Sequence, residues 1–340
     1  DKVSIVGGAS INAHRDLDLF FLFEYRHLFP TLFFETFYLT RNIEDQSVYS
    51  AYKIDNNLKF RLIEFRSGLR LPIYGTELEI YGSWSRYRAS IKENIIGQPQ
   101  IQSGIAYDYF NGKKIGFDWQ LKRYKRRIDQ NINPVGFNLN LSLANEWNEF
   151  IDGIDLSNSG TLISKFKDHN LIRGNITGQY LWEIPGSNRW TISAKGQLGW
   201  ISDAGVDSFF HFFGGGMPGL KGYPYYSIEG SNMMIYDLGL RIPLFREKHF
   251  PIGWFTLQHS TLGIISQFGD AWNRNESEYL LKRSRGIEWR LSGYSFYNYP
   301  TSLSLEYHQG IDRFTMDIGD GTPINYGKKG RYYFSVLFGF

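Results

Sequence analysis

Apolar and polar residues alternate along most of this 340-residue chain, and the alternation limits the folds that it can adopt. Within residues 137–144 every second residue is apolar, and the residues between them are small or polar. Segment 301–310 places Leu303, Leu305 and Tyr307 on one face and Ser302, Ser304, Glu306 and His308 on the other. Successive side chains of a β-strand point to opposite faces, so this period indicates strands that separate two environments. We therefore predict an all-β fold.

The aromatic content decides between a soluble and a membrane-bound β protein. Phe, Tyr and Trp make up 17% of the chain, although its mean hydropathy is negative, at -0.34. A soluble protein of this polarity rarely carries so many rings, because exposed rings promote association. In a membrane barrel the rings face lipid and the interfacial girdles, while polar groups face a wet lumen. The sequence thus predicts a transmembrane antiparallel β-barrel that crosses the bacterial outer membrane many times.

A helical anchor is not expected, because the longest apolar run, 19–23, has five residues and a spanning helix needs roughly 20. Fifteen strand-like segments follow one another: 2–12, 16–26, 31–41, 57–71, 76–92, 101–111, 114–127, 137–148, 170–184, 188–202, 231–244, 254–271, 284–296, 301–310 and 331–340. Bacterial barrels normally have an even number of strands, so we expect about 16, with a further strand at 43–56 or 149–169. A soluble sandwich or propeller is disfavoured, because the strands are long and no blade-length repeat appears. Residues 1–340 are predicted to form a single barrel domain.

Residue patterns that support catalysis or cofactor binding are scarce. The sequence has no cysteine, no G-x-S-x-G, H-E-x-x-H or P-loop lysine motif, and no metal-ligand spacing among its seven histidines. Residues 214–219 match G-x-G-x-x-G, but Pro218 favours a loop over the helix start that a dinucleotide requires. A net charge of +3 is too small to indicate a nucleic-acid partner. We expect no enzymatic activity, cofactor or metal site.

A basic run, Lys-Arg-Tyr-Lys-Arg-Arg, occupies residues 122–127. It continues a strand in which Phe117, Trp119 and Leu121 share one face. Cations at the end of such a strand line a lumen or meet anionic groups at a membrane rim, and both interpretations are favoured over nucleic-acid binding.

An ordered set of motifs occupies the rest of the chain. A glycine-rich segment leads to Leu220-Lys221-Gly222-Tyr223, and Arg-Ile-Pro-Leu follows at 241–244. Phe-Gly-Asp-Ala-Trp lies at 268–272, and Asn-Pro-Val-Gly forms a turn at 133–136. Together these motifs resemble the BamA/TamA superfamily of outer-membrane barrels, over roughly residues 115–340. The resemblance implies that a loop at about 203–230 folds into the lumen and that five strands follow it.

The resemblance also implies a lock that holds this loop. Lys221 takes the place of the family's arginine, Gly222 lets the backbone pass close to the barrel wall, and Tyr223 packs beside it. An unpaired buried charge costs several kcal/mol, so Lys221 requires a carboxylate on the wall. The candidate partners are Asp270 first, Glu288 second, and Asp237, which replaces a family acid where this chain has Gly239. The alternative is a solvated lysine in a mobile loop.

The final strand, 331–340, places Tyr332, Phe334, Val336, Phe338 and Phe340 on one face. A terminal strand that ends on an aromatic residue resembles the recognition signal for outer-membrane assembly, carried here by Phe334, Phe338 and Phe340. The alternative is a core strand that happens to end in phenylalanine.

Three function classes remain. The resemblance favours insertion or translocation of proteins across the outer membrane, as part of a larger complex. The chain alternatively serves as a membrane anchor or exporter for a soluble domain outside it, or as a passive diffusion pore. The expected partners are outer-membrane lipids and lipopolysaccharide, with a protein substrate or partner subunits. Asp1 begins directly on strand-like sequence without a signal peptide, so we expect a mature chain or a fragment.

Deleting Phe340 tests the assembly signal. We expect less protein in the outer membrane and more degradation in the periplasm, because the assembly machinery reads the terminal ring. Immunoblots of fractionated cells measure both quantities, and Leu337→Ala provides a control in the same strand. Wild-type levels after the deletion would argue for an ordinary core strand.

Overall fold

The computed structural model describes residues 2–11, 16–49, 52–73, 75–95, 102–156, 162–203, 205–273, 279–296, 298–317 and 323–338. Among these residues, no helix is long and apolar enough to cross a membrane. The strands are β1 (Val3–Ile11), β2 (Leu17–Tyr25), β3 (Thr31–Tyr49), β4 (Tyr52–Ile73), β5 (Thr76–Ile95), β6 (Gln102–Tyr124), β7 (Gly136–Leu156), β8 (Leu162–Glu183), β9 (Thr191–Ile201), β10 (Phe212–Phe213), β11 (Glu229–Gly230), β12 (Asn232–Phe245), β13 (Phe250–Ile252), β14 (Phe255–Trp272), β15 (Lys282–Ser295), β16 (Tyr299–Gly310), β17 (Phe314–Asp317), β18 (Pro323–Tyr326) and β19 (Arg331–Phe338). Two short 3-10 helices, η1 (Ser208–Phe210) and η2 (Tyr225–Ser227), lie between β9 and β12.

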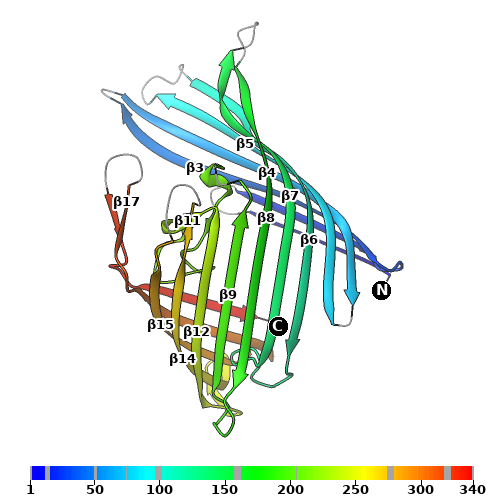
Figure 1. The fold of residues 1–340 in the computed structure, drawn as a ribbon, viewed down its shortest axis with the longest axis vertical. Coiled ribbons are helices and arrows are strands. Elements are labelled where there is room, and N and C mark those ends of the chain that lie inside the picture. The colour runs from blue at the N-terminus through cyan, green and yellow to red at the C-terminus, as the bar shows by residue number, and fades with distance from the viewer. Residues whose placement is uncertain are drawn as a thin grey trace. The chain divides into compact units, whose positions relative to one another are not determined.

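One large sheet contains most of these strands, in the order β1-β2-β3-β4-β5-β6-β7-β8-β9-β12-β14-β15-β16-β19. Strand β13 pairs with β14, while β10-β11 and β17-β18 form two small separate sheets. Each strand of the path lies beside its nearest predecessor in sequence, which is the up-and-down order of membrane barrels (Figure 1). The predicted all-β, antiparallel architecture is confirmed, and five strands follow the loop as expected.

The strand boundaries need three corrections. Segments 101–111 and 114–127 form one strand, β6, so the path has fourteen strands among the described residues. The sequence predicts a turn at Asn111-Gly112, because this pair favours hairpin turns, but both residues lie within the strand. A Cβ on Gly112 would approach the Phe110 ring to 2.5 Å, so the glycine serves close packing. The expected extra strands at 43–56 and 149–169 are also wrong, because those regions extend β3, β4, β7 and β8.

The chain divides into two compact units. The first comprises Asp1–Trp119 and Ser142–Arg173. Its exposed rings form a ladder across neighbouring strands, in which Phe34 lies 6.5 Å from Phe21 and 6.2 Å from Phe65, and Phe65 stacks on Trp84 at 5.7 Å. The buried face of the same strands carries Arg66 and Glu79, which form an ion pair. Cross-strand ring contacts of this kind stabilise one face of a sheet.

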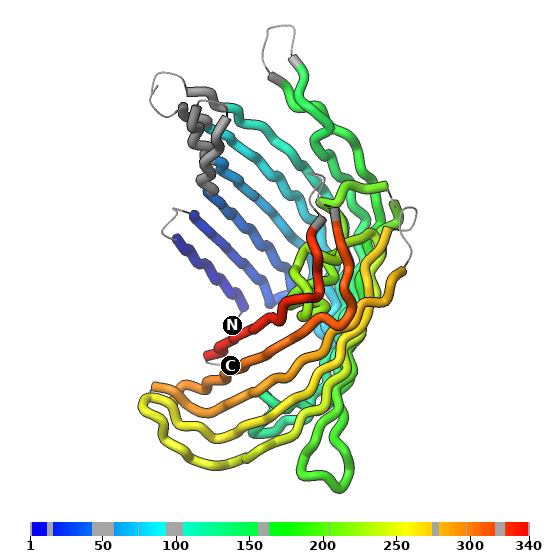
Figure 2. Tube along the Cα trace, turned by 90° about the vertical axis from the view of Figure 1, so that its left-hand side faces the viewer, coloured from blue at the N-terminus to red at the C-terminus, as the bar shows by residue number. Residues whose placement is uncertain are grey.

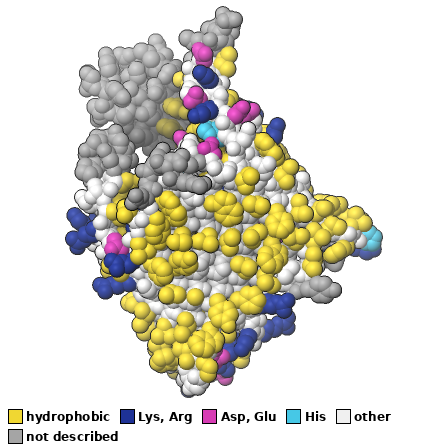
Figure 3. All heavy atoms as spheres, viewed as in Figure 1, with side chains coloured by type: hydrophobic (Ala, Val, Ile, Leu, Met, Phe, Trp, Pro, Cys, Tyr) yellow, Lys and Arg dark blue, Asp and Glu magenta, His cyan; other side chains and the backbone are white. Residues whose placement is uncertain are grey.

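The second unit comprises Gln120–Leu141 and Gly174–Phe340. Its outer face, meaning the face with exposed apolar side chains, includes Ile264, Ile287 and Leu305, which are between 48% and 57% exposed. The inner face carries polar residues, and Glu306 and His308 are buried there, as the alternation in 301–310 predicted. Figure 3 shows apolar side chains gathered over β9 and β12, and Figure 2 shows the same strands from the side. The unit thus presents apolar groups outward and polar groups inward.

The last strand, β19, also carries exposed apolar side chains on one face. Tyr332, Phe334, Val336 and Phe338 are all exposed on β19 and share one face, as predicted. Phe340 lies outside the described residues. The role of these rings in assembly stays a prediction.

Candidate functional site

The glycine-rich loop between β9 and β12 folds tightly upon itself. Strands β10 and β11 pair at its base, and the Leu220 amide donates to the Gly214 carbonyl at 2.7 Å. A Cβ on Gly215 would lie 1.9 Å from the Pro224 carbonyl oxygen, and one on Gly219 would lie 2.1 Å from that of Gly214. Only glycine permits such close backbone crossings. The glycines therefore shape the loop that presents Lys221.

An apolar cluster anchors the loop against the strands. Leu220 and Tyr223 are fully buried and pack with Ile228, Ile235 of β12 and Ala271 of β14. Burying a leucine side chain completely contributes about 1.5–3 kcal/mol. The cluster thus fixes the residues on both sides of Lys221.

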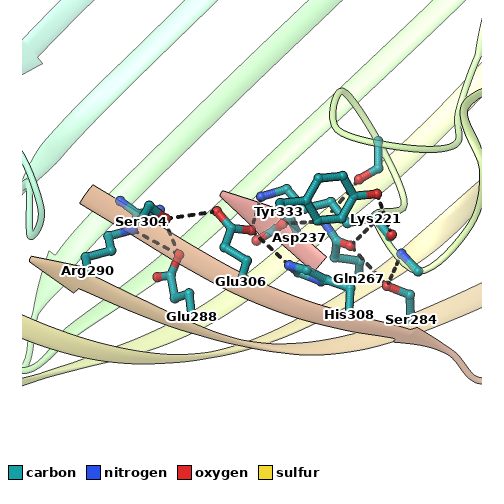
Figure 4. A network of polar contacts seen from close by, with 12 residues as sticks. Lys221, Asp237, Gln267, Ser284, Glu288, Arg290, Ser304, Glu306, His308 and Tyr333 are labelled. Atoms are coloured by element: carbon teal, nitrogen blue, oxygen red, sulfur yellow. Dashed lines mark hydrogen bonds and ion pairs between the residues drawn. The ribbon is translucent and has the colours of Figure 1, made fainter. Parts of the chain in front are cut away.

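Lys221 forms an ion pair with Glu306 of β16 (Figure 4). Both side chains are largely buried, at 18% and 11% exposure. The same carboxylate also contacts the His308 ring, with 2.9 Å between Nε2 and Oε2. A buried ammonium is stable only beside a compensating carboxylate that has further hydrogen-bond partners, and Glu306 meets both conditions.

The predicted pairing of Lys221 with Asp270 is wrong. Asp270 binds the ammonium of Lys282 and accepts the backbone amides of Ala271 and Leu280 at 2.9 and 2.8 Å. Gln267 of the same strand does contact the loop, and Asp270 lies three positions further on. Both side chains are almost fully buried, at 2% and 1% exposure, and the Asp270 carboxylate is already occupied by these three partners.

The two other predicted partners have different roles. Glu288 pairs with Arg241 at 2.6 Å and with Arg290 at 2.7 Å, and its side chain is 1% exposed. Arg241 is the cation of the Arg-Ile-Pro-Leu motif, so this motif is fixed by Glu288. Asp237 accepts a hydrogen bond from the amide of Gln267 at 2.8 Å. Neither carboxylate forms an ion pair with Lys221.

The backbone around Lys221 is also tethered to the inner face. Its amide donates to Gln267 Oε1 at 2.9 Å, and the Gln267 side-chain amide donates to the Gly219 carbonyl at 3.0 Å. Tyr333 of β19 donates to the Lys221 carbonyl at 2.8 Å. Ser284 of β15 donates to Gln267 Oε1 at 3.0 Å. With Glu306, four strands hold this one segment of the loop (Figure 4).

Gly222 and Tyr223 also lie against the inner face of the strands. A Cβ on Gly222 would lie 2.5 Å from the Gly310 amide nitrogen and 2.8 Å from Ser284 Cβ, so a larger residue would push the loop off the wall. The Tyr223 hydroxyl lies 2.8 Å from the Arg283 carbonyl oxygen and accepts the Asp312 amide at 3.1 Å. Burial raises the pKa of Tyr223 to about 12, so this phenol stays protonated at neutral pH.

Sequence reasoning missed five residues of the site: Gln267, Ser284, Glu306, His308 and Tyr333. Glu306 and His308 stand on the polar face that the alternation identified, but nothing in that pattern indicates which polar residue meets the loop. Gln267 and Ser284 lie opposite one another in the β14–β15 ladder. That register depends on strand pairing across 17 residues, and a single sequence does not reveal it.

The site holds a loop in place, and its groups are already engaged with one another. Among the described residues, no group of three or more His, Asp or Glu side chains is arranged to hold a metal ion. Its carboxylates bind cations of the chain itself, as Glu306 and Glu288 do. The site therefore fastens the loop to the inner face of the strands.

A double-mutant cycle tests the Lys221–Glu306 pair. Lys221→Ala and Glu306→Ala should each destabilise the loop, by about 3–5 kcal/mol in a dry site and by less where water enters, since each leaves a buried charge unpaired. The double variant should lose clearly less than the sum of the two single losses. Unfolding in denaturant, followed by intrinsic fluorescence, measures the free energies.

The combination of Lys221→Ala with Asp270→Ala is the matched control. Its losses should add, because Asp270 pairs with Lys282. Additive losses for Lys221 and Glu306 would contradict the pairing. Strong coupling between Lys221 and Asp270 would restore the partner that the sequence suggested.

Comparisons with known proteins identify solved structures that share this fold. No protein-family model matches the chain, and a search of curated proteins finds no significant match. Among solved structures, BamA from Haemophilus ducreyi lacking POTRA domains 1–3 aligns with 99% of this chain and 70% of its own, at TM-score 0.52 and 14% identity. CdiB from Acinetobacter baumannii aligns at TM-score 0.56 and 12% identity, and CdiB from Escherichia coli at 0.54 and 10%. This chain is covered to 98% in both cases, and it spans 56% and 55% of the two CdiB chains. The chain therefore has the β-barrel fold that BamA and CdiB share.

Proposed function

We propose that this chain is an outer-membrane barrel that inserts proteins into the outer membrane or moves them across it, as a subunit of a larger complex. The fold it shares with BamA and CdiB supports this role. The proposal includes no catalytic step. It places outer-membrane lipids and lipopolysaccharide around the barrel, and a protein substrate or partner subunits as its specific ligands.

The fastened loop is the observation that carries the proposal. A passive pore needs a lumen that stays open to solutes, whereas here a loop is tied to the inner face of four strands. The contacts around Lys221 are mainly polar, and their partners can exchange with water once the loop moves. The apolar cluster around Leu220 and Tyr223 opposes wetting, so displacement of the whole loop also requires a partner that covers these side chains. This chemistry suits a loop that is displaced when a polypeptide arrives.

A second role, as membrane anchor or exporter for a soluble domain outside the chain, needs no loop movement. The two roles therefore differ in one measurable property. Protein traffic requires the release of the Lys221 segment from Glu306, and an anchor functions with the segment fixed. A passive pore requires a third property, a steady ion conductance in the wild-type protein.

A reversible cross-link tests the proposal. The natural chain has no cysteine, so Lys221→Cys combined with Glu306→Cys introduces the only thiols. A short bis-methanethiosulfonate reagent, which forms a disulfide with each cysteine and releases methanesulfinate, then bridges the loop to β16 in liposomes that contain the full chain. We expect the uncross-linked double variant to accelerate insertion of an unfolded outer-membrane protein, and the bridge to stop it until reducing agent is added. Protease protection of the substrate measures insertion.

A control bridge between Lys328→Cys and Lys329→Cys, which are exposed neighbours before β19, should leave insertion unchanged. Insertion at the wild-type rate with the Lys221–Glu306 bridge closed would contradict loop release. No acceleration over empty liposomes, together with a steady conductance, would favour the passive pore.

A further inference from the structure

The outer face of the second unit carries an apolar pocket of about 380 Å³ over β14, β15, β16 and β19. We call it the outer-face pocket. Its apolar lining includes Leu262, Ile287, Trp289, Leu305, Tyr307 and Tyr332. Glu288 and Glu306 also border it, but their carboxylates are engaged on the inner face by Arg241 and Lys221. The pocket is therefore separate from the loop lock.

The registers of the strands arrange the outer face in rows. One row consists of Ile264, Ile287 and Tyr307. The next row toward the end that carries the glycine-rich loop consists of Ser266, Arg285 and Gln309. Ser266 and Arg285 are exposed, whereas Gly286 between the two rows of β15 is buried. The outer face thus changes from apolar to polar directly above the pocket.

Arg285 carries the positive charge of the polar row. The nearby carboxylates bind other cations, because Asp312 pairs with Arg283 and Asp270 pairs with Lys282. Among the residues that the structure describes, no carboxylate forms an ion pair with Arg285. Ser266 lies opposite Arg285 in the β14–β15 ladder, and the Cβ atoms of such a pair are about 5 Å apart. A guanidinium and a hydroxyl at this separation can donate to one phosphate group.

The lengths of the connections identify the side of the membrane on which this row lies. At the strand ends near Arg285, the connections 202–231 and 311–330 are long. At the opposite ends, the connections 184–190 and 296–298 are short. Outer-membrane barrels have long extracellular loops and short periplasmic turns. In the outer membrane that the proposed function requires, the polar row therefore lies at the extracellular leaflet, whose principal lipid is lipopolysaccharide.

We propose that the outer face of β14, β15 and β16 binds the lipid A part of lipopolysaccharide, with a phosphate on Arg285 and an acyl chain in the outer-face pocket. Arginine binds phosphate oxygens through paired, charge-assisted hydrogen bonds. The pocket begins at Ile287, two residues or about 7 Å further along β15. A phosphorylated lipid meets both the charge and the apolar pocket, and lipid A is the one that the extracellular leaflet supplies.

This proposal rests on the outer-membrane location in the proposed function, but not on the protein that the barrel transports. Lipid binding is measured without a substrate protein. A failure to bind lipid A and a failure to insert proteins are therefore distinguishable.

Native mass spectrometry of the full chain in detergent tests the proposal. Diphosphorylated lipid A should be retained in preference to a dephosphorylated form with the same acyl chains, and in preference to phosphatidylglycerol. Arg285→Gln should weaken retention of diphosphorylated lipid A about fivefold, which is the contribution of one cation near an anionic membrane surface. Arg285→Lys keeps the charge and should retain the lipid. Arg126→Gln removes an exposed arginine at the opposite strand ends and should bind as the wild type does.

A second variant tests the pocket. Ile287 is 55% exposed, so Ile287→Trp enlarges the lining without burying a larger side chain in the fold. The variant should show the heat-dependent gel mobility of a folded barrel and should retain less lipid A, because the new ring occupies the space of the acyl chain.

Four results would overturn the proposal. Equal retention of the phosphorylated and dephosphorylated forms would show that charge does not select the ligand. Equal retention of phosphatidylglycerol would show that the site accepts any phosphorylated lipid. Unchanged binding in Arg285→Gln, with the barrel folded, would place lipid A elsewhere. Displacement by glycerophosphate at the concentration at which lipid A binds would identify a free-phosphate site, because the acyl chains would then contribute nothing.

Discussion

The loop depends on the buried ammonium of Lys221, which needs a carboxylate that only the barrel wall supplies. Glu306 meets that need from β16, and His308 on the same face orients its carboxylate. The surrounding contacts follow from this pair: once the ammonium is fixed, the Lys221 amide and carbonyl reach Gln267 and Tyr333. One charge on a flexible loop thus joins strands that are distant in sequence.

A lysine imposes different geometry from an arginine at this position. Guanidinium binds a carboxylate through a planar two-pronged contact, whereas ammonium is a compact charge on a flexible stem. Here the second positively charged group of the wall, Arg241, binds Glu288 instead. The inner face therefore contains two neighbouring ion-pair systems, linked through the register of β15 with β16, where Glu288 lies opposite Glu306. Lysine therefore holds the loop through fewer directional bonds than arginine would.

The fold could be predicted from the sequence, because the alternation of apolar and polar residues is a local property of each segment. Most strands of the path contain a segment with period two, and Leu305 and Glu306 take the faces that the pattern assigns. The site was predicted only in part. Lys221, Gly222 and Tyr223 were found from an ordered motif, but the partner of Lys221 depends on which strands meet and in what register. Asp270 was chosen for its motif, but its carboxylate is engaged by Lys282 of the neighbouring strand β15. The merged strand β6 was missed because Asn111-Gly112 resembles a turn when its packing partners are unknown.

The central claim is that Glu306 holds the loop against the inner face, and a distance measurement tests it most directly. Spin labels at Tyr226→Cys, on the exposed part of the loop, and at Ile264→Cys, on the outer face of β14, report their separation by pulsed electron resonance. The account predicts one narrow distance distribution in the otherwise wild-type chain and a broad one when Glu306→Ala is added. A broad distribution with Glu306 present, or a narrow one that survives its removal, would contradict the account.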